Sequence, residues 1–90
     1  MTPEDRLELL DFPCDFPIKA FGQGGENFDL TVVEIVRRHA PNLGEGAVSV
    51  RASRGGRYQA VTVTIRATDQ AQLDAIYHDL SACESVLMAL

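Results

Sequence analysis

Two segments of this 90-residue chain carry groups that could bind an anion: a glycine-rich loop and a hairpin with two arginines, Arg54 and Arg57. The first is Gly22-Gln23-Gly24-Gly25, which comes directly before a segment whose apolar residues recur at helical spacing. Backbone N–H groups at a helix N-terminus attract anions, because they lack partners within the helix and lie at the positive end of its dipole. Arginines on a nearby hairpin could add charge. We therefore expect a small-molecule site built from Gln23, Gly24, Gly25, Asn27, Arg54 and Arg57.

A second interpretation of the glycines is that they only turn the chain. The segment matches neither a dinucleotide fingerprint nor a phosphate-binding loop with its lysine. Glu26, at the same helix N-terminus, would repel an anion. Acylphosphatases have the fold predicted below and use an arginine in this loop, but the loop here contains none, so no catalytic residue is predicted.

Of the two histidines, His39 is the better candidate for a functional role, because it follows Arg37-Arg38 and precedes Ala40-Pro41. No Cys, Asp or Glu lies beside it at the spacing of a metal site, so we predict neither a metal nor a cofactor. A position at a helix C-terminus, where the ring packs or bonds the last carbonyls, is the expected role. The same turn is a candidate partner-binding segment through Arg38, His39 and Pro41.

Charge and cysteine content restrict the location and the partners. The formal net charge of −5 argues against binding to nucleic acid or to an anionic membrane, since both require a positive field. No apolar run approaches the ~20 residues that span a bilayer, and the first residues lack the pattern of a signal peptide. Cys14 and Cys83 form no CxxC pair and are expected to be free thiols. These features predict a cytoplasmic protein.

The clearest structural pattern is a β-hairpin from Val48 to Ile65, with Gly55-Gly56 as its two-residue loop. Two glycines accept the positive φ angles of tight hairpin turns. With this loop, Val50 lies opposite Val61 and Val48 opposite Val63, which makes one face a block of valines. A slip of one residue would mix the two faces, so the pattern specifies the register.

The other elements complete a β-α-β-β-α-β order. We predict a strand from Phe16 to about Gly22, a helix from Glu26 or Asn27 to about His39, a helix from Gln70 to about Leu80 with an Asp69/Gln72 capping box, and a strand from Ser85 to Leu90. This order predicts one α+β domain over residues 1–90: a ferredoxin-like sandwich with a four-stranded antiparallel sheet in order 4-1-3-2 and two helices on one face. Residues 1–15 form an extended N-terminal arm, anchored by Phe12 or Phe16.

The predicted sheet leaves one face without helices. Its exposed positions are Lys19, Phe21, Tyr58, Ala60, Thr62, Thr64 and Leu87. Aromatic residues on such a face are typical of RNA-recognition motifs, but the further basic and aromatic residues of those motifs are missing. A half-apolar face more often packs against protein. Phe21 and Tyr58 are therefore the candidate partner-binding residues of this face.

The sequence resembles the YbeD-like family of small bacterial proteins. The resemblance rests on Leu9-Leu10-Asp11-Phe12-Pro13, Gly22-Gln23, Arg38-His39-Ala40-Pro41, Ser53 with Gly55 and Tyr58, and Leu87-Met88-Ala89-Leu90. It implies a ferredoxin-like fold similar to ACT domains, the regulatory modules that bind amino acids and related metabolites, and it implies an association with lipoate metabolism. The chain departs from the family pattern by the extra Gly24-Gly25.

Two functions from different classes follow. The first is a non-catalytic regulatory module that binds a small metabolite and acts in trans. The alternative is an adaptor that needs no ligand and binds another protein through the open sheet face. Either is compatible with a monomer or a homodimer.

Overall fold

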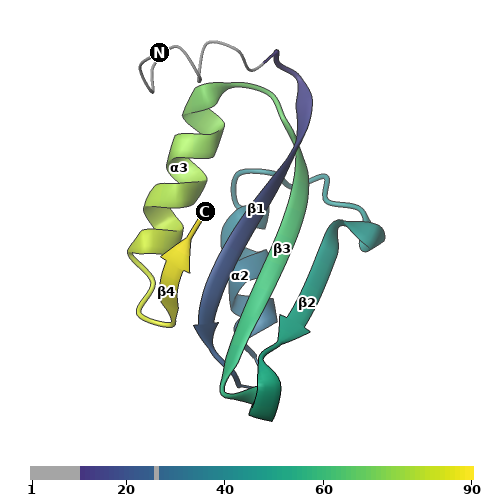
Figure 1. The fold of residues 1–90 in the computed structure, drawn as a ribbon. Helices are drawn as coiled ribbons and strands as arrows, with labels where there is room; N and C mark the ends of the chain where they lie inside the picture. Colours follow the sequence, from purple (N-terminus) through teal and green to yellow (C-terminus); the bar gives the residue numbers. More distant parts are fainter. Residues whose placement is uncertain (1–10, 26) are drawn as a thin grey trace, which may run out of the picture.

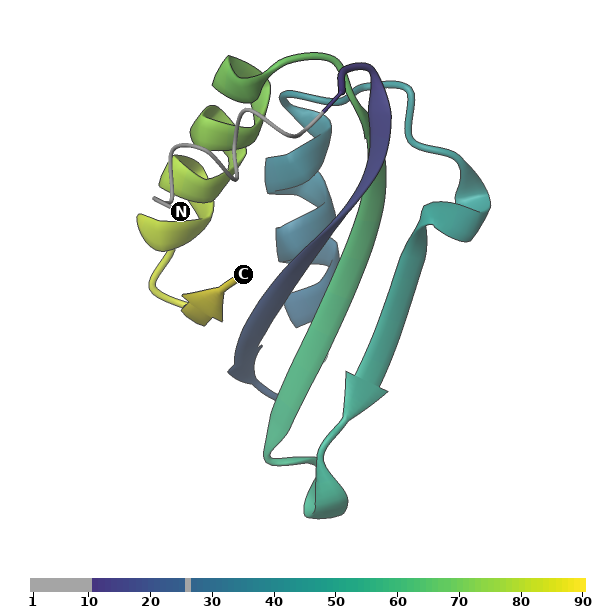
Figure 2. The same cartoon turned by 45° about the horizontal axis from the view of Figure 1, so that its top comes forward.

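The computed structural model describes residues 11–25 and 27–90, which form four strands, two α-helices and two short 3-10 helices, Glu45–Ala47 and Arg54–Gly56. The elements are β1 (Cys14–Gln23), α2 (Phe28–Arg37), β2 (Val48–Ala52), β3 (Tyr58–Ala67), α3 (Gln70–Ser81) and β4 (Val86–Ala89). All strand pairs are antiparallel, and the order across the sheet is β2-β3-β1-β4. This is the predicted order read from the other edge (Figure 1). Both helices lie on one face, as the tilted view shows (Figure 2).

The hairpin has the predicted register, with Val48 opposite Val63 and Val50 opposite Val61. Its loop is longer than predicted. Strand pairing stops at Ala52, and residues 54–57 form a four-residue connection in which Gly55 and Gly56 have φ angles of 85° and 73°. The two-residue loop was therefore wrong, although the demand for positive φ at both glycines was right.

Ser53 explains the longer loop. Its carbonyl accepts from Gly56 N–H at 2.8 Å and closes the turn, so that this oxygen is unavailable to the strand opposite. The Ser53 hydroxyl accepts from Tyr58 N–H at 3.0 Å instead, while Ser53 N–H donates to the Tyr58 carbonyl at 2.8 Å. One side chain thus replaces a backbone acceptor at the end of the ladder.

The core lies between the helices and the inner face of the sheet. Every second residue of β1 and β3 faces the helices, and one stripe of residues on α2 and on α3 faces the sheet. Apolar residues occupy these inward positions. The buried apolar side chains are Ile18, Ala20, Phe28, Val32, Ile35, Val36, Val61, Val63, Ile65, Ala67, Leu73, Ile76 and Leu80. On α2 the buried residues are Phe28, Val32, Ile35 and Val36, and on α3 they are Leu73, Ile76 and Leu80, with Tyr77 partly buried beside them.

Both helices have ends that sequence reasoning located to within two residues. α2 ends at Arg37, earlier than the predicted His39, and His39 N–H and Ala40 N–H donate to the Val36 carbonyl at 3.0 and 2.9 Å. α3 begins at Gln70, with the Asp69 carboxylate accepting from Gln72 N–H at 2.8 Å. Residues 38–41 are therefore a turn, held close to the end of α2.

The N-terminal arm is shorter than predicted in the described part of the chain, because β1 already begins at Cys14. Phe12 and Phe16, the predicted anchors, both pack against the core. The remainder of the predicted arm, residues 1–10, lies outside the described residues.

The fourth strand contains an irregularity that changes the open face. Phe21 lies opposite Met88, whereas the adjacent Gly22 lies opposite Val86, so one extra residue is inserted in β4. Met88, rather than the predicted Leu87, therefore shares the open face with Phe21. Leu90 and Lys19 exchange both backbone hydrogen bonds, at 3.0 and 2.8 Å, which extends this pairing beyond Ala89.

Candidate functional site

The glycine loop packs against the hairpin tip. Gly24 N–H donates to the Arg57 carbonyl at 2.7 Å, and a Cβ on Gly24 would collide with the Gly56 carbonyl oxygen. A Cβ on Gly22 would collide with the Phe28 ring and with the Ser85 carbonyl. Close backbone approach therefore requires both glycines, and the Gly24 amide is already occupied.

A cavity of about 330 Å³ adjoins this loop. It is lined by Gln23, Gly24, Glu84, Ser85 and Leu87. Glu84 and Ser85 were absent from the predicted ligand residues, although the topology places the start of the last strand at this end. Glu84 contributes a carboxylate, so the lining favours an amino group over a bare anion.

The structure brings together only part of the predicted ligand set. Gln23 and Gly24 line the cavity, and the Arg57 backbone lies beside Gly24. Asn27 precedes α2 and its side chain makes no capping hydrogen bond. Arg54 lies exposed in the hairpin turn, and Gly25 borders open space. These last three residues do not line the cavity.

His39 lies at the opposite end of the molecule, where it joins the two helices. Its Nε2 lies 2.6 Å from Oδ2 of Asp79 on α3. Its backbone carbonyl accepts from Gln72 Nε2 at 2.8 Å. Gln72 Oε1 in turn accepts from Thr68 N–H at 2.8 Å, so one amide side chain holds the start of α3 and the end of α2.

The histidine hydrogen bond also sets the charge state of its partner. It stabilises the ionised carboxylate and is the largest cause of the lowered pKa of Asp79; burial opposes it, and smaller coulombic effects of His39, His78 and Arg38 lower the pKa further. Nε2 is accordingly the donor in this pair.

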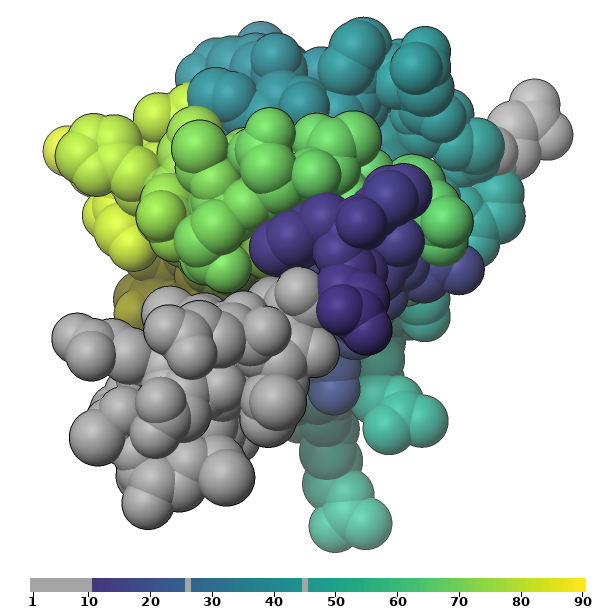
Figure 3. All heavy atoms as spheres, turned by 90° about the horizontal axis from the view of Figure 1, so that it is seen from above, coloured from purple at the N-terminus to yellow at the C-terminus, as the bar shows by residue number. Residues whose placement is uncertain are grey.

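Seen from this end, α3 in green and the start of β1 in purple form one continuous surface with the teal segment that follows α2 (Figure 3).

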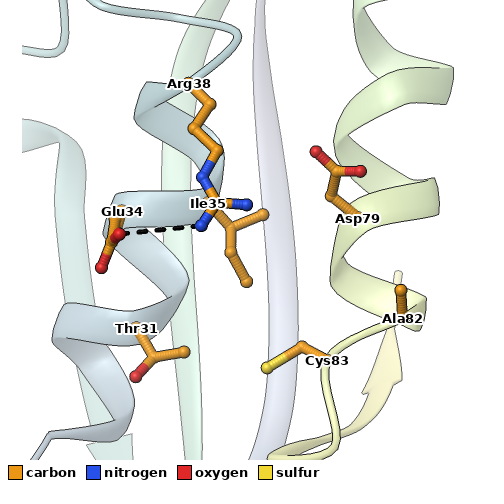
Figure 4. A pocket seen from close by; sticks show the side chains of 7 residues that line it. All are labelled: Thr31, Glu34, Ile35, Arg38, Asp79, Ala82 and Cys83. Atoms are coloured by element: carbon orange, nitrogen blue, oxygen red, sulfur yellow. Dashed lines mark ion pairs between the residues drawn. The ribbon is translucent and has the colours of Figure 1, made fainter.

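A groove of about 290 Å³ runs between the helices just beyond this pair (Figure 4). Its walls carry Thr31, Glu34, Ile35, Arg38, Asp79, Ala82 and Cys83. Arg38 Nη2 lies 3.6 Å from Glu34 Oε1, so part of the charge in the groove is already paired.

Cys14 and Cys83 are free thiols. Within residues 11–25 and 27–90 no group of three or more His, Cys, Asp or Glu side chains could hold a metal ion.

The open sheet face, defined as the face without helices, has two adjoining hollows of about 220 and 320 Å³. Phe21, Arg51 and Ala60 line both of them. Tyr58 borders the smaller hollow and is 44% exposed, and Met88, opposite Phe21, is 54% exposed. The predicted residues Phe21 and Tyr58 therefore lie together on one surface, whereas Arg38, His39 and Pro41 lie at a different end.

The same face is locally positive in an acidic chain. Lys19 and Arg51 flank the hollows, and no ion pair links either to another described residue. Farther along the face, Asp15 and Arg66 lie 3.4 Å apart and balance each other. The predicted hairpin register already places Arg51 on this face, and the pairing of Arg51 with Ala60 confirms it, although Arg51 was not among the predicted partner-binding residues.

A four-stranded antiparallel sheet with two helices on one face defines a ferredoxin-like α+β domain. The described residues include no helix long and apolar enough to cross a membrane. The solution structure of protein HP0495 from H. pylori has the same fold, with a TM-score of 0.70 at 11% identity, over 100% of this chain and 94% of that one.

The chain belongs to the family described as protein of unknown function (DUF493), whose model matches residues 7–90. A UPF0250 protein of Chromobacterium violaceum is 46% identical over 97% of this chain and 98% of its own length. A UPF0250 protein of Nitrosomonas europaea is 42% identical over the full length of both chains. The resemblance to the YbeD-like family of small bacterial proteins is confirmed, and the names of these relatives assign no reaction.

Proposed function

We propose that this protein is a non-catalytic interaction module that binds another protein through the part of its open sheet face around Phe21 and Tyr58. The observation that carries the proposal is the grouping of Phe21, Tyr58, Lys19 and Arg51 around two adjoining hollows, with the exposed Met88 opposite Phe21. Aromatic residues, methionine and arginine are the residue types enriched at protein interfaces. An adaptor acting in trans in the cytoplasm would use this surface.

The charge of the surface indicates the chemistry of the partner. Lys19 and Arg51 would attract acidic side chains, whereas Phe21 and Tyr58 offer apolar contact at the centre. The partner surface should therefore present apolar residues surrounded by Asp or Glu. Such contacts should weaken as salt rises, because the charged contribution is screened.

A charge substitution tests the proposal. Tyr58→Glu should abolish retention of partner proteins on an affinity column without changing the circular dichroism spectrum. Thr64→Glu is the matched control, since Thr64 is exposed on the same strand and face, roughly 20 Å away at about 3.4 Å per residue. Equal retention by the wild type and Tyr58→Glu would rule out this face.

The cavity beside the glycine loop supports a second candidate function, in which the domain senses a small metabolite. Glu84, Ser85 and Gln23 could hold the amino and hydroxyl groups of an amino acid or related amine. A thermal-unfolding screen should include amino acids and lipoate-related acids. A ligand at ~100 times its dissociation constant stabilises the fold by about 2.7 kcal/mol, and Glu84→Gln should reduce the shift for amines.

A further inference from the structure

The outer edge of β2 presents backbone groups that no described strand pairs. Ser53 N–H donates to the Tyr58 carbonyl, and antiparallel ladders alternate hydrogen-bonded with non-hydrogen-bonded pairs. Arg51 and Ser49 therefore bond to Ala60 and Thr62 on β3. The N–H and C=O groups of Val48, Val50 and Ala52 point away from β3, at the end of the sheet order.

The side chains along this edge are apolar and incompletely covered. Val50 is 45% exposed although it faces the helix side, because β2 is an outer strand and the helices lie over the central strands (Figure 2). Ala52 is exposed as well, and Val48 is half-buried. Natural edge strands are usually protected by a bulge, a proline or an inward charge. β2 pairs regularly along its whole length, and its one charged residue, Arg51, lies on the open face.

We propose that β2 pairs with β2 of a second copy of this chain, which joins two sheets into one continuous sheet. The inference is independent of the partner assigned to the open face. In an antiparallel pairing centred on Val50, that residue meets the partner's Val50 and Val48 meets the partner's Ala52. All of these residues have outward backbone groups, so the pairing forms about six hydrogen bonds.

The same centre also gives the best side-chain pairing. Val48, Val50 and Ala52 continue the apolar strip onto the partner, and Arg51 lies opposite the partner's Ser49. A shift that places Val50 opposite the partner's Ala52 would bring the two Arg51 side chains face to face, which is unfavourable. A shift in the other direction loses hydrogen bonds. Sequence and register thus select one self-complementary arrangement.

Proline at position 50 provides a selective test. Val50 N–H points outward, so Val50→Pro removes a donor from the proposed dimer but none from the β2–β3 ladder, and edge strands tolerate such a proline. Val50→Thr is the matched control, because it keeps both the N–H and the β-branched shape. In sedimentation velocity over a concentration series, the wild type and Val50→Thr should dimerise, and Val50→Pro should need at least tenfold higher concentration.

Amide hydrogen exchange of the wild type supplies a second measurement that does not depend on folding of the proline variant. Exchange at Val48, Val50 and Ala52 should slow as the protein concentration rises, whereas exchange at Ser49 and Arg51 should stay slow throughout. A wild type that is monomeric at millimolar concentration, or a dimer that Val50→Pro leaves unchanged, would overturn the proposal. Loss of the dimer in Tyr58→Glu alone would place the dimer contact on the open face instead.

Discussion

The imidazole Nε2 of His39 and the carboxylate Oδ2 of Asp79 lie 2.6 Å apart across a sequence separation of 40 residues. This hydrogen bond connects the turn after α2 with the side of α3. Together with the bond from Gln72 to the His39 carbonyl, it fixes the two helices to each other at one end of the molecule. The turn that carries the Arg38-His39-Ala40-Pro41 sequence is thus a structural junction.

The first prediction concerns acid stability. The pKa of Asp79 is lower in the folded protein than in the unfolded chain, chiefly because of the hydrogen bond from His39. Stability from this source is therefore present above the ordinary carboxyl pKa near 4 and is lost as the pH falls through the lowered value. Urea unfolding at pH 7 and at pH 3 should show a smaller loss of stability for Asp79→Asn than for the wild type. Asp74→Asn, whose carboxylate meets only the exposed Gln70 amide, is the control and should follow the wild type.

The second prediction concerns the helix junction. Gln72→Ala removes a donor to the His39 carbonyl and an acceptor for Thr68 N–H, so the free energy of unfolding should fall by about 1–2 kcal/mol. Chemical denaturation measures the change. Asp74→Ala removes only the exposed hydrogen bond from the Gln70 amide on the same helix, so it should change the free energy of unfolding by about 0.5 kcal/mol at most. Equal effects of the two substitutions would mean that Gln72 does not join the helices.

The third prediction separates the two roles considered for the glycine loop. Gly24→Ala should destabilise the fold by about 1–3 kcal/mol, because its Cβ meets the rigid Gly56 carbonyl. Gly25→Ala should be tolerated within about 0.5 kcal/mol, since nothing lies within 4 Å of the added Cβ. Thermal unfolding of both variants without ligand gives the comparison. A stable Gly24→Ala protein would contradict the close approach of the loop and the hairpin tip.

Much of the fold could be predicted because local patterns and long-range requirements agree. The alternating valines of the hairpin allow only one register with an apolar inner face, and Val48 and Val50 pair as expected. The four-residue loop could not be predicted from Gly55-Gly56 alone. It depends on two hydrogen bonds of Ser53, whose carbonyl accepts from Gly56 N–H and whose hydroxyl accepts from Tyr58 N–H, and composition does not reveal them.

The candidate sites were harder to predict, because they depend on contacts between distant segments. Nothing near His39 in the sequence indicates Asp79, although the α3 stripe of Leu73, Ile76 and Leu80 places position 79 beside the buried face. The inserted residue in β4 exchanged Leu87 for Met88 on the open face, and no pattern marks that bulge. Phe21 and Tyr58 were found together because both strands alternate regularly.

The long pairing of β1 with β3 has a consequence for how the chain folds. β1 pairs along its whole length with β3, from Cys14 opposite Ala67 to Gln23 opposite Tyr58. During synthesis, β1 therefore leaves the ribosome well before its partner strand exists, whereas β2 and β3 are neighbours in the sequence. We expect the hairpin to close first and to serve as the template onto which β1 docks. In stopped-flow kinetics, Val61→Ala should then slow refolding, whereas Ala89→Gly should mainly speed unfolding.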